Sequence, residues 1–130
     1  GGSWGTALAV HLATKKHQIK LWEFFEQQAR EMQEKRGCPL LPGVHLSDTI
    51  TVSSDMGFTL TGAEQVLIVV PSDKVESTIE KAKQYVDGNS VLLERSSWEI
   101  NDYGLWHSGL NSIHKDCCGW TIEPFEVDAP

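Results

Sequence analysis

The sequence predicts an α/β protein with a doubly wound parallel sheet, and three observations support this prediction. A glycine-rich turn, Gly1-Gly2-Ser3-Trp4-Gly5, leads directly into a mostly apolar helical run. Strand-like runs then alternate with helical segments through residues 1–93. Residues 66–70 are apolar without a break, as a strand covered on both faces requires. This alternation is typical of a sheet with helices on both faces.

The first half of the chain is expected to form a helix, a strand and a second helix. The first helix should span residues 3–14, and residues 18–22 alternate as a short strand. Residues 24–37 have a long polar face that predicts a surface helix, with Phe25, Ala29 and Met32 as its apolar contacts. Two prolines predict a loop over residues 38–44.

The second half is expected to continue the alternation. Its elements are a strand over 49–52, a short helix over 56–61 capped by Ser54 or Asp55, a strand over 65–70 ending at Pro71, a helix over 73–85 and a strand over 90–93. From residue 94 onward, neither helical nor strand periodicity is clear. We therefore expect a partial domain over residues 1–93 and an irregular, divergent tail over 94–130.

The glycine turn is a candidate phosphate site. The first amides of a helix lack internal partners and carry partial positive charge, and glycine lets a pyrophosphate approach them. Gly2 and Gly5 fit the second and third glycines of G-x-G-x-x-G, with Gly1 between the first two. The sequence shows neither the first glycine nor the preceding central strand. Strands 19–22 and 66–70 would then face a gap, and each buried unpaired group costs about 1–3 kcal/mol.

Glu23 is a candidate ligand for the adenosine ribose. It ends the strand over 18–22, near the ~20-residue spacing at which this fold places an acid on that sugar. A carboxylate accepts a hydrogen bond from the 2′-hydroxyl of NAD but repels the 2′-phosphate of NADP, and no cation follows until Arg30. We therefore expect NAD to be preferred at least about tenfold. The alternative is that Glu23 is a solvated surface charge.

Composition limits the partners and the compartment. A net charge of −7 argues against nucleic acid, and no apolar run approaches the ~20 residues of a membrane span. The chain shows no signal-peptide pattern. Three cysteines, two of them adjacent, make no disulfide framework, so we expect a cytoplasmic protein without a nucleic-acid or membrane partner.

Four stretches together resemble the NAD(P)-dependent glycerol-3-phosphate dehydrogenases, over residues 1 to about 93. They are Gly2-Ser3-Trp4-Gly5-Thr6-Ala7-Leu8-Ala9, Leu21-Trp22-Glu23-Phe24, Leu41-Pro42-Gly43-Val44 and Val69-Val70-Pro71-Ser72. The resemblance implies a Rossmann-type domain, with hydride transfer between glycerol-3-phosphate and dihydroxyacetone phosphate. It also implies that the backbone around Ser3 and Trp4 contacts the cofactor pyrophosphate, that Phe24 lies against the adenosine, and that Pro71 lines the cofactor cleft.

Further expectations follow for the neighbours of this site and for the intact protein. Trp22 and Phe25 are expected in the core. The intact protein is expected to bind a small phosphorylated substrate and to form a homodimer.

Residues 94–130 do not match the pattern of the family. The family's Ser/Ala-Lys-Gly motif is absent here, where the sequence reads Glu94-Arg95-Ser96-Ser97. The family's second domain, which carries the catalytic residues, is not in this sequence. We therefore expect a fragment without catalytic residues, whose reading frame changes near Leu93. A genuine extension is the alternative. No metal site is expected among the potential ligands His107, His114, Cys117 and Cys118, because adjacent cysteines chelate one tetrahedral ion poorly.

Two other functions remain open on the sequence. The chain could be a non-catalytic dinucleotide-binding remnant, or part of another hydroxyacid dehydrogenase with the same cofactor fold.

Overall fold

The computed structural model describes residues 1–86, 91–94, 111–116 and 119–124, with side chains for 1–71 and 73–86. Its contacts divide the chain into two compact units, Gly1–Thr61 and Gly62–Pro130. The predicted domain boundary near residue 93 stays a prediction. In the part of the chain that the structure covers, no helix has the length and apolar character needed to cross a membrane.

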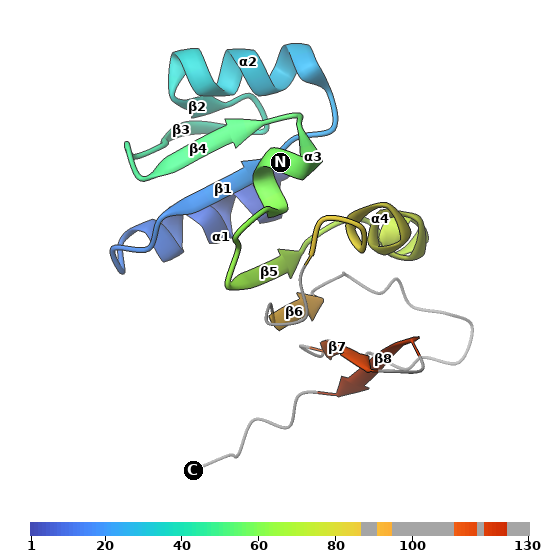
Figure 1. Cartoon of the computed structure of the whole chain (residues 1–130). Coiled ribbons are helices and arrows are strands. Elements are labelled where there is room, and N and C mark those ends of the chain that lie inside the picture. The colour runs from blue at the N-terminus through green and yellow to red at the C-terminus, as the bar shows by residue number, and fades with distance from the viewer. Residues whose placement is uncertain (87–90, 95–110, 117–118, 125–130) are drawn as a thin grey trace, which may run out of the picture. The chain divides into compact units, whose positions relative to one another are not determined.

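The first unit combines three helices with a parallel strand pair and a small hairpin. Its elements are α1 (Ser3–Ala13), β1 (Ile19–Trp22), α2 (Glu26–Lys35), β2 (Gly37–Cys38), β3 (Leu41–His45), β4 (Ile50–Ser53) and α3 (Met56–Leu60). β1 pairs with β4 in parallel, from Ile19 opposite Ile50 to Trp22 opposite Ser53 (Figure 1). The predicted helices and strands of this unit are confirmed to within a few residues.

The core of the first unit lies between the helices and the β1–β4 pair. It consists of Ala9 from α1, Leu21 from β1, Ala29 and Met32 from α2, Cys38, Leu46, and Ile50 and Val52 from β4. Met32, Leu46 and Ile50 are at most 1% exposed. Burying such side chains is the main favourable contribution to folding, at roughly 1.5–3 kcal/mol for a large one.

The α3 helix begins where the sequence predicts. Asp55 is its N-cap residue, and the Asp55 carboxylate accepts a hydrogen bond from the Phe58 amide at 2.9 Å. A side-chain oxygen at this position satisfies an amide that has no partner within the helix. Of the two predicted caps, Asp55 is thus confirmed.

The predicted loop over residues 38–44 is wrong, because β2 and β3 pair there as an antiparallel hairpin. Cys38 lies opposite Leu41, and Gly37 lies opposite His45. Proline is compatible with an edge strand, where its missing N–H needs no ladder partner, so Pro42 does not prevent β3.

The second unit contains a four-stranded sheet in the order β5-β6-β7-β8 (Figure 1). Its elements are β5 (Gln65–Ile68), the 3-10 helix η1 (Ser72–Lys74), α4 (Val75–Ala82), β6 (Val91–Glu94), β7 (Asn111–Asp116) and β8 (Gly119–Pro124). β5 and β6 run parallel, and β6, β7 and β8 run antiparallel. The predicted strand over 65–70 and helix over 73–85 are confirmed with shorter bounds, and the strand over 90–93 is confirmed one residue later.

One feature of the sheets differs from the prediction. The tail contains β7 and β8, so its described residues are not irregular; their pairing joins residues with little local periodicity. The parallel pairing of β1 with β4 and of β5 with β6, together with the helices, confirms the α/β class. The arrangement of these strands as a doubly wound sheet stays a prediction.

Candidate dinucleotide-binding site

The N-terminus of α1 has the geometry of an anion site. Gly2 is the N-cap residue, with φ −65° and ψ 179°, and it makes no side-chain cap hydrogen bond. The Thr6 amide donates to the Gly2 carbonyl at 2.9 Å, closing the first helical turn. The amides of Ser3, Trp4 and Gly5 therefore lie at the helix end, where helical geometry leaves amides without internal acceptors.

Thr6 stabilises the glycine turn, a role that was not predicted from the sequence. Its side chain is fully buried, and its hydroxyl donates to the Gly1 carbonyl at 3.3 Å. A small hydroxyl residue directly after the last glycine of the motif is the signal that could have identified it.

The two leading glycines have different surroundings. A Cβ at Gly1 would lie 3.1 Å from the Glu23 Cβ, so a side chain there would force Glu23 to move. A Cβ at Gly2 would meet nothing within 4 Å. Packing within the protein therefore does not require glycine at position 2. The absence of a side chain at Gly2 leaves the α1 amides accessible to a ligand.

The glycine turn lies against the carboxyl end of β1. The Gly1 nitrogen donates to the Trp22 carbonyl and lies 3.6 Å from the Glu23 Oε2 atom. Burial lowers the pKa of the Gly1 amino group below its usual value, and the Glu23 carboxylate opposes that effect. These contacts bring the candidate phosphate and ribose residues to one end of the unit.

Glu23 is only 5% exposed, so the alternative of a solvated surface charge is wrong. Its Oε1 atom accepts a hydrogen bond from the Phe25 amide at 3.1 Å, and its own amide donates to Ser53 at 2.9 Å. These bonds fix Glu23 between the glycine turn and the start of α2. Its role as a ribose ligand stays a prediction.

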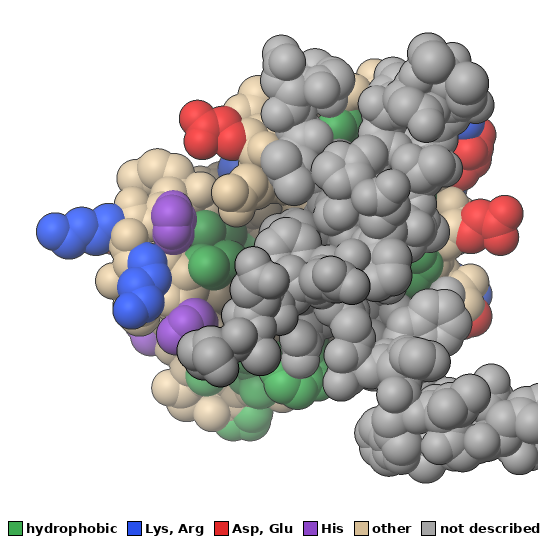
Figure 2. Space-filling model, turned by 90° about the horizontal axis from the view of Figure 1, so that it is seen from below, with side chains coloured by type: hydrophobic (Ala, Val, Ile, Leu, Met, Phe, Trp, Pro, Cys, Tyr) green, Lys and Arg blue, Asp and Glu red, His purple; other side chains and the backbone are tan. Residues whose placement is uncertain are grey.

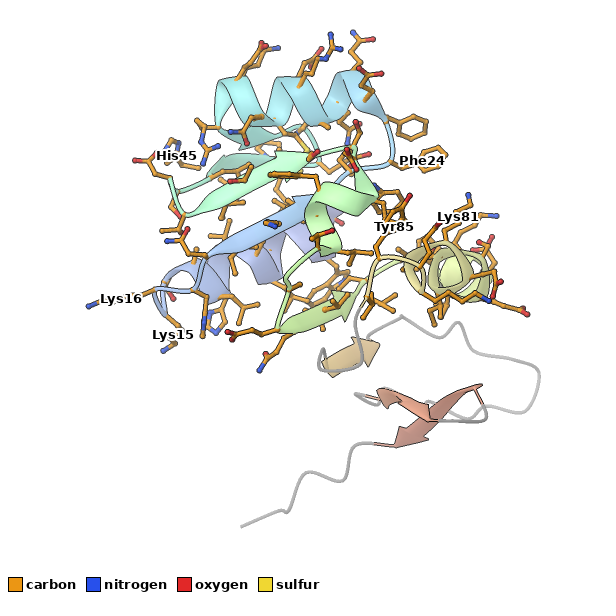
Figure 3. All side chains as sticks on the ribbon, viewed as in Figure 1. Lys15, Lys16, Phe24, His45, Lys81 and Tyr85 are labelled. Carbon is orange, nitrogen blue, oxygen red and sulfur yellow. The ribbon has the colours of Figure 1, made fainter. Side chains whose placement is uncertain are left out.

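Phe24 and Phe25 present aromatic surface beside Glu23. They are 63% and 64% exposed, with ring centroids 5.1 Å apart in an edge-to-face arrangement. Phe24 also meets Trp22 at 6.0 Å, and its side chain projects outward in Figure 3. The expectation of Phe25 in the core is wrong, because Phe25 is the N-cap residue of α2 and the buried face starts at Ala29.

Trp22 is half-buried, so it lies between the core and the surface. Its indole N–H donates to the Ser54 carbonyl at 3.0 Å. This bond fixes the ring against which Phe24 packs.

Pro71 belongs to the second unit, and its place relative to the glycine turn stays a prediction. It is exposed, and its carbonyl accepts the Lys74 amide at 2.8 Å as η1 begins. Beside it, the Lys74 ammonium lies 2.8 Å from Asp73 and holds the pKa of that carboxyl below its usual range. Both side chains of this pair are exposed, so the pair contributes little to stability.

Two lysine side chains of the first unit lie at the end of α1 opposite to the glycine turn. Lys15 and Lys16 project beyond the C-terminal end of α1, and Figure 3 shows His45 on the same side. Figure 2 shows lysine or arginine and histidine side chains together at that end. A phosphate at the glycine turn would therefore depend on backbone amides and the helix dipole.

The described residues hold no cluster of three or more histidine, cysteine or acidic side chains that could bind a metal. His107, Cys117 and Cys118 lie outside the described residues, and of His114 the structure describes only the backbone in β7.

A glycine turn at a helix N-terminus, beside an acid at the end of a parallel strand, is typical of the nucleotide-binding α/β domains. Residues 1–96 match the family model described as NAD-dependent glycerol-3-phosphate dehydrogenase N-terminus. The chain therefore belongs to this family, and its resemblance over residues 1–93 is confirmed.

Individual relatives agree with this assignment. The chain is 41% identical over 93 residues to a glycerol-3-phosphate dehydrogenase [NAD(P)+] of Syntrophomonas wolfei, covering 71% of this chain and 27% of that protein. It is 37% identical over 108 residues to the enzyme of that name from Neisseria meningitidis, covering 80% and 32%. The crystal structure of a glycerol-3-phosphate dehydrogenase from Coxiella burnetii matches with a TM-score of 0.71 and 32% identity, covering 75% and 30%. The chain thus spans about a quarter to a third of these relatives.

Proposed function

We propose that residues 1–96 are the cofactor-binding part of an NAD-dependent glycerol-3-phosphate dehydrogenase. The α1 N-terminus would hold the pyrophosphate through the amides around Gly2, Ser3, Trp4 and Gly5. Glu23 would accept a hydrogen bond from the ribose hydroxyl, and Phe24 would lie against the adenosine. Pro71 would line the cofactor cleft. The observation that carries the proposal is the open N-terminus of α1 directly beside the buried Glu23.

NAD is proposed over NADP because of the charge at the ribose position. A 2′-phosphate there would meet the buried Glu23 carboxylate, whose burial limits its screening by water. Arg30, the first cation after Glu23 along the chain, forms an ion pair with Glu26 one turn earlier on α2. The Glu26 carboxylate therefore partly offsets the positive charge of Arg30 even when no phosphate is bound.

In the whole enzyme, the bound cofactor would carry the hydride between glycerol-3-phosphate and dihydroxyacetone phosphate. The groups that bind this substrate and donate the proton would belong to the part of the relatives that this chain does not match. We therefore expect the 130-residue chain to bind the cofactor without turning over substrate. A non-catalytic dinucleotide-binding protein would behave in the same way, and the activity of a full-length protein carrying this domain would distinguish the two.

Calorimetric titration with NADH and NADPH tests the proposal. We expect NADH to bind at least about tenfold more tightly, which corresponds to ~1.4 kcal/mol. Equal or tighter binding of NADPH would contradict the proposed role of Glu23. Steady-state oxidation of NADH with dihydroxyacetone phosphate by residues 1–130 would contradict the proposal that this chain binds the cofactor without turning over substrate.

A further inference from the structure

The β4 strand has an outer edge that faces away from β1. On its inner edge, the carbonyls of Thr49 and Ser53 accept amides of β1 at 2.8 and 2.9 Å. Alternate residues of a parallel strand direct their backbone groups to opposite edges, so the groups of Ile50 and Val52 point outward. Among the described residues of the first unit, no second strand pairs with this outer edge.

Two polar side chains at the C-terminal end of α2 occupy the outward-facing groups of β4. The Gln33 Oε1 atom accepts the Val52 amide at 2.7 Å, and the Arg36 guanidinium donates to the Ile50 carbonyl at 2.8 Å. Arg36 also donates to the same Gln33 Oε1 atom at 3.1 Å, which joins the two side chains. Because both neighbours of this atom are donors, it is the oxygen of the carboxamide.

These contacts reproduce the hydrogen bonds that a neighbouring strand would make. In a parallel ladder, one residue donates its N–H to a carbonyl and accepts the amide two positions further along the neighbouring strand. Arg36 supplies the donor to Ile50, and Gln33 supplies the acceptor for Val52, two positions later. The two side chains therefore take the place of a strand residue opposite Thr51.

The backbone groups that these side chains satisfy belong to core residues. Ile50 and Val52 are only 1% and 5% exposed, and an unsatisfied amide or carbonyl at such positions costs about 1–3 kcal/mol. An edge strand with free groups is also a template for pairing with another chain, and charged side chains on the edge oppose that pairing. The position of Arg36 and Gln33 thus affects association as well as stability.

We propose that Gln33 and Arg36 close the outer edge of β4 to pairing with a strand from a second copy of the chain. A pairing strand would have to displace the Gln33 oxygen from the Val52 amide and the charged guanidinium from the Ile50 carbonyl. The proposal does not involve the cofactor, so its failure would leave the proposed function intact.

Hydrogen exchange and sedimentation of the Gln33→Ala variant of the 130-residue chain test the proposal. Alanine removes the acceptor, favours the helix and adds no large apolar side chain. In dilute solution we expect exchange at the Val52 amide to accelerate at least about tenfold, while exchange at Leu21, which faces the inner edge, stays slow. In concentrated solution the variant should self-associate, and protection at Val52 should return because a second strand supplies an acceptor.

Two further variants are matched controls. Gln33→Glu keeps an oxygen that can accept the Val52 amide beside the Arg36 guanidinium, so it should behave as the parent in both measurements. Gln27→Ala makes the same replacement at an exposed glutamine elsewhere on α2 and should also behave as the parent.

Three results would overturn the proposal. The first is a Gln33→Ala variant that keeps the association state of the parent at every concentration. The second is equal self-association of the Gln27→Ala and Gln33→Ala variants. The third is equal acceleration of exchange at Leu21 and Val52, because Gln33 would then stabilise the whole unit rather than close one edge.

Discussion

At the end of β1, the Glu23 carboxylate stabilises two neighbouring pieces of backbone. It accepts the Phe25 amide at the start of α2 and lies beside the Gly1 nitrogen. Its position in the chain could be predicted from the spacing after the glycine turn. Its burial could not, because burial depends on how the turn, β1 and α2 come together.

The substitution Glu23→Gln tests the charge at this position. Glutamine keeps an oxygen that accepts the Phe25 amide but removes the negative charge. We expect the preference for NADH over NADPH to fall roughly three- to tenfold, mainly through tighter NADPH binding. Calorimetry on both cofactors measures the ratio.

Glu34→Gln is the matched control, because Glu34 is an exposed carboxylate on α2. It changes the net charge equally and should leave the ratio unchanged. A similar fall in both variants would mean that net charge, rather than the position of Glu23, sets the preference.

The aromatic residues show a second limit of sequence reasoning. Phe24 and Phe25 are adjacent and chemically identical, and both are exposed. Helical periodicity placed Phe25 on the apolar face of α2 with Ala29 and Met32. The helix starts one residue later, at Glu26, and the N-cap residue does not follow its periodicity.

Among the elements, the link from α2 to β4 depends on Arg36. This residue adopts a left-handed conformation with φ 53° at the C-cap of α2. Its guanidinium donates to the carbonyls of Leu46, Ser47 and Ile50, and to the Gln33 side chain, which in turn accepts the Val52 amide. This network joins the end of the helix to the connection before β4.

Arg36→Gly tests this network. Glycine suits a positive φ, so the backbone should not be strained, and the variant loses the Arg36 side chain with its guanidinium donors. We expect the free energy of unfolding to fall by about 1–3 kcal/mol, because partly buried carbonyls lose their donors. Urea unfolding measures the change.

Arg30→Ala is the comparison for Arg36. Arg30 forms an exposed ion pair with Glu26 on the same helix, and such pairs contribute about 0.3–0.5 kcal/mol. An Arg36→Gly variant as stable as Arg30→Ala would show that the network does not hold α2 to β4.

The elements missed from the sequence share one physical cause. β2, β3, β7 and β8 are short or lack periodicity, and they exist through antiparallel pairing with another segment. The elements that were predicted, such as α1, β1 and β5, carry their signal within their own residues. Local pattern therefore identified most of the parallel strands and helices and missed the antiparallel pairs.

At the scale of the whole molecule, the sequence predicted the α/β class and the family, and both are confirmed. The glycine turn, Glu23 and Phe24 lie within the first unit, where the structure describes them together, whereas Pro71 belongs to the second unit. The place of Pro71 in the site therefore stays a prediction.

The central claim is that the α1 N-terminus binds a dinucleotide, and Gly2→Val is the variant that addresses it most specifically. A side chain at Gly2 meets no protein atom within 4 Å, and its φ of −65° suits any residue. The variant should therefore keep the stability of the parent while blocking the approach of a pyrophosphate.

The most direct measurement is an NMR titration of the 130-residue chain and its Gly2→Val variant with NADH. In the parent we expect amide shifts concentrated at residues 2–5 and 23–25, with Lys15, Lys16 and His45 unchanged. The variant should bind at least about tenfold more weakly, equivalent to ~1.4 kcal/mol. Equal affinity in the two proteins, or shifts centred on Lys15 and Lys16 beyond the C-terminal end of α1, would contradict the account.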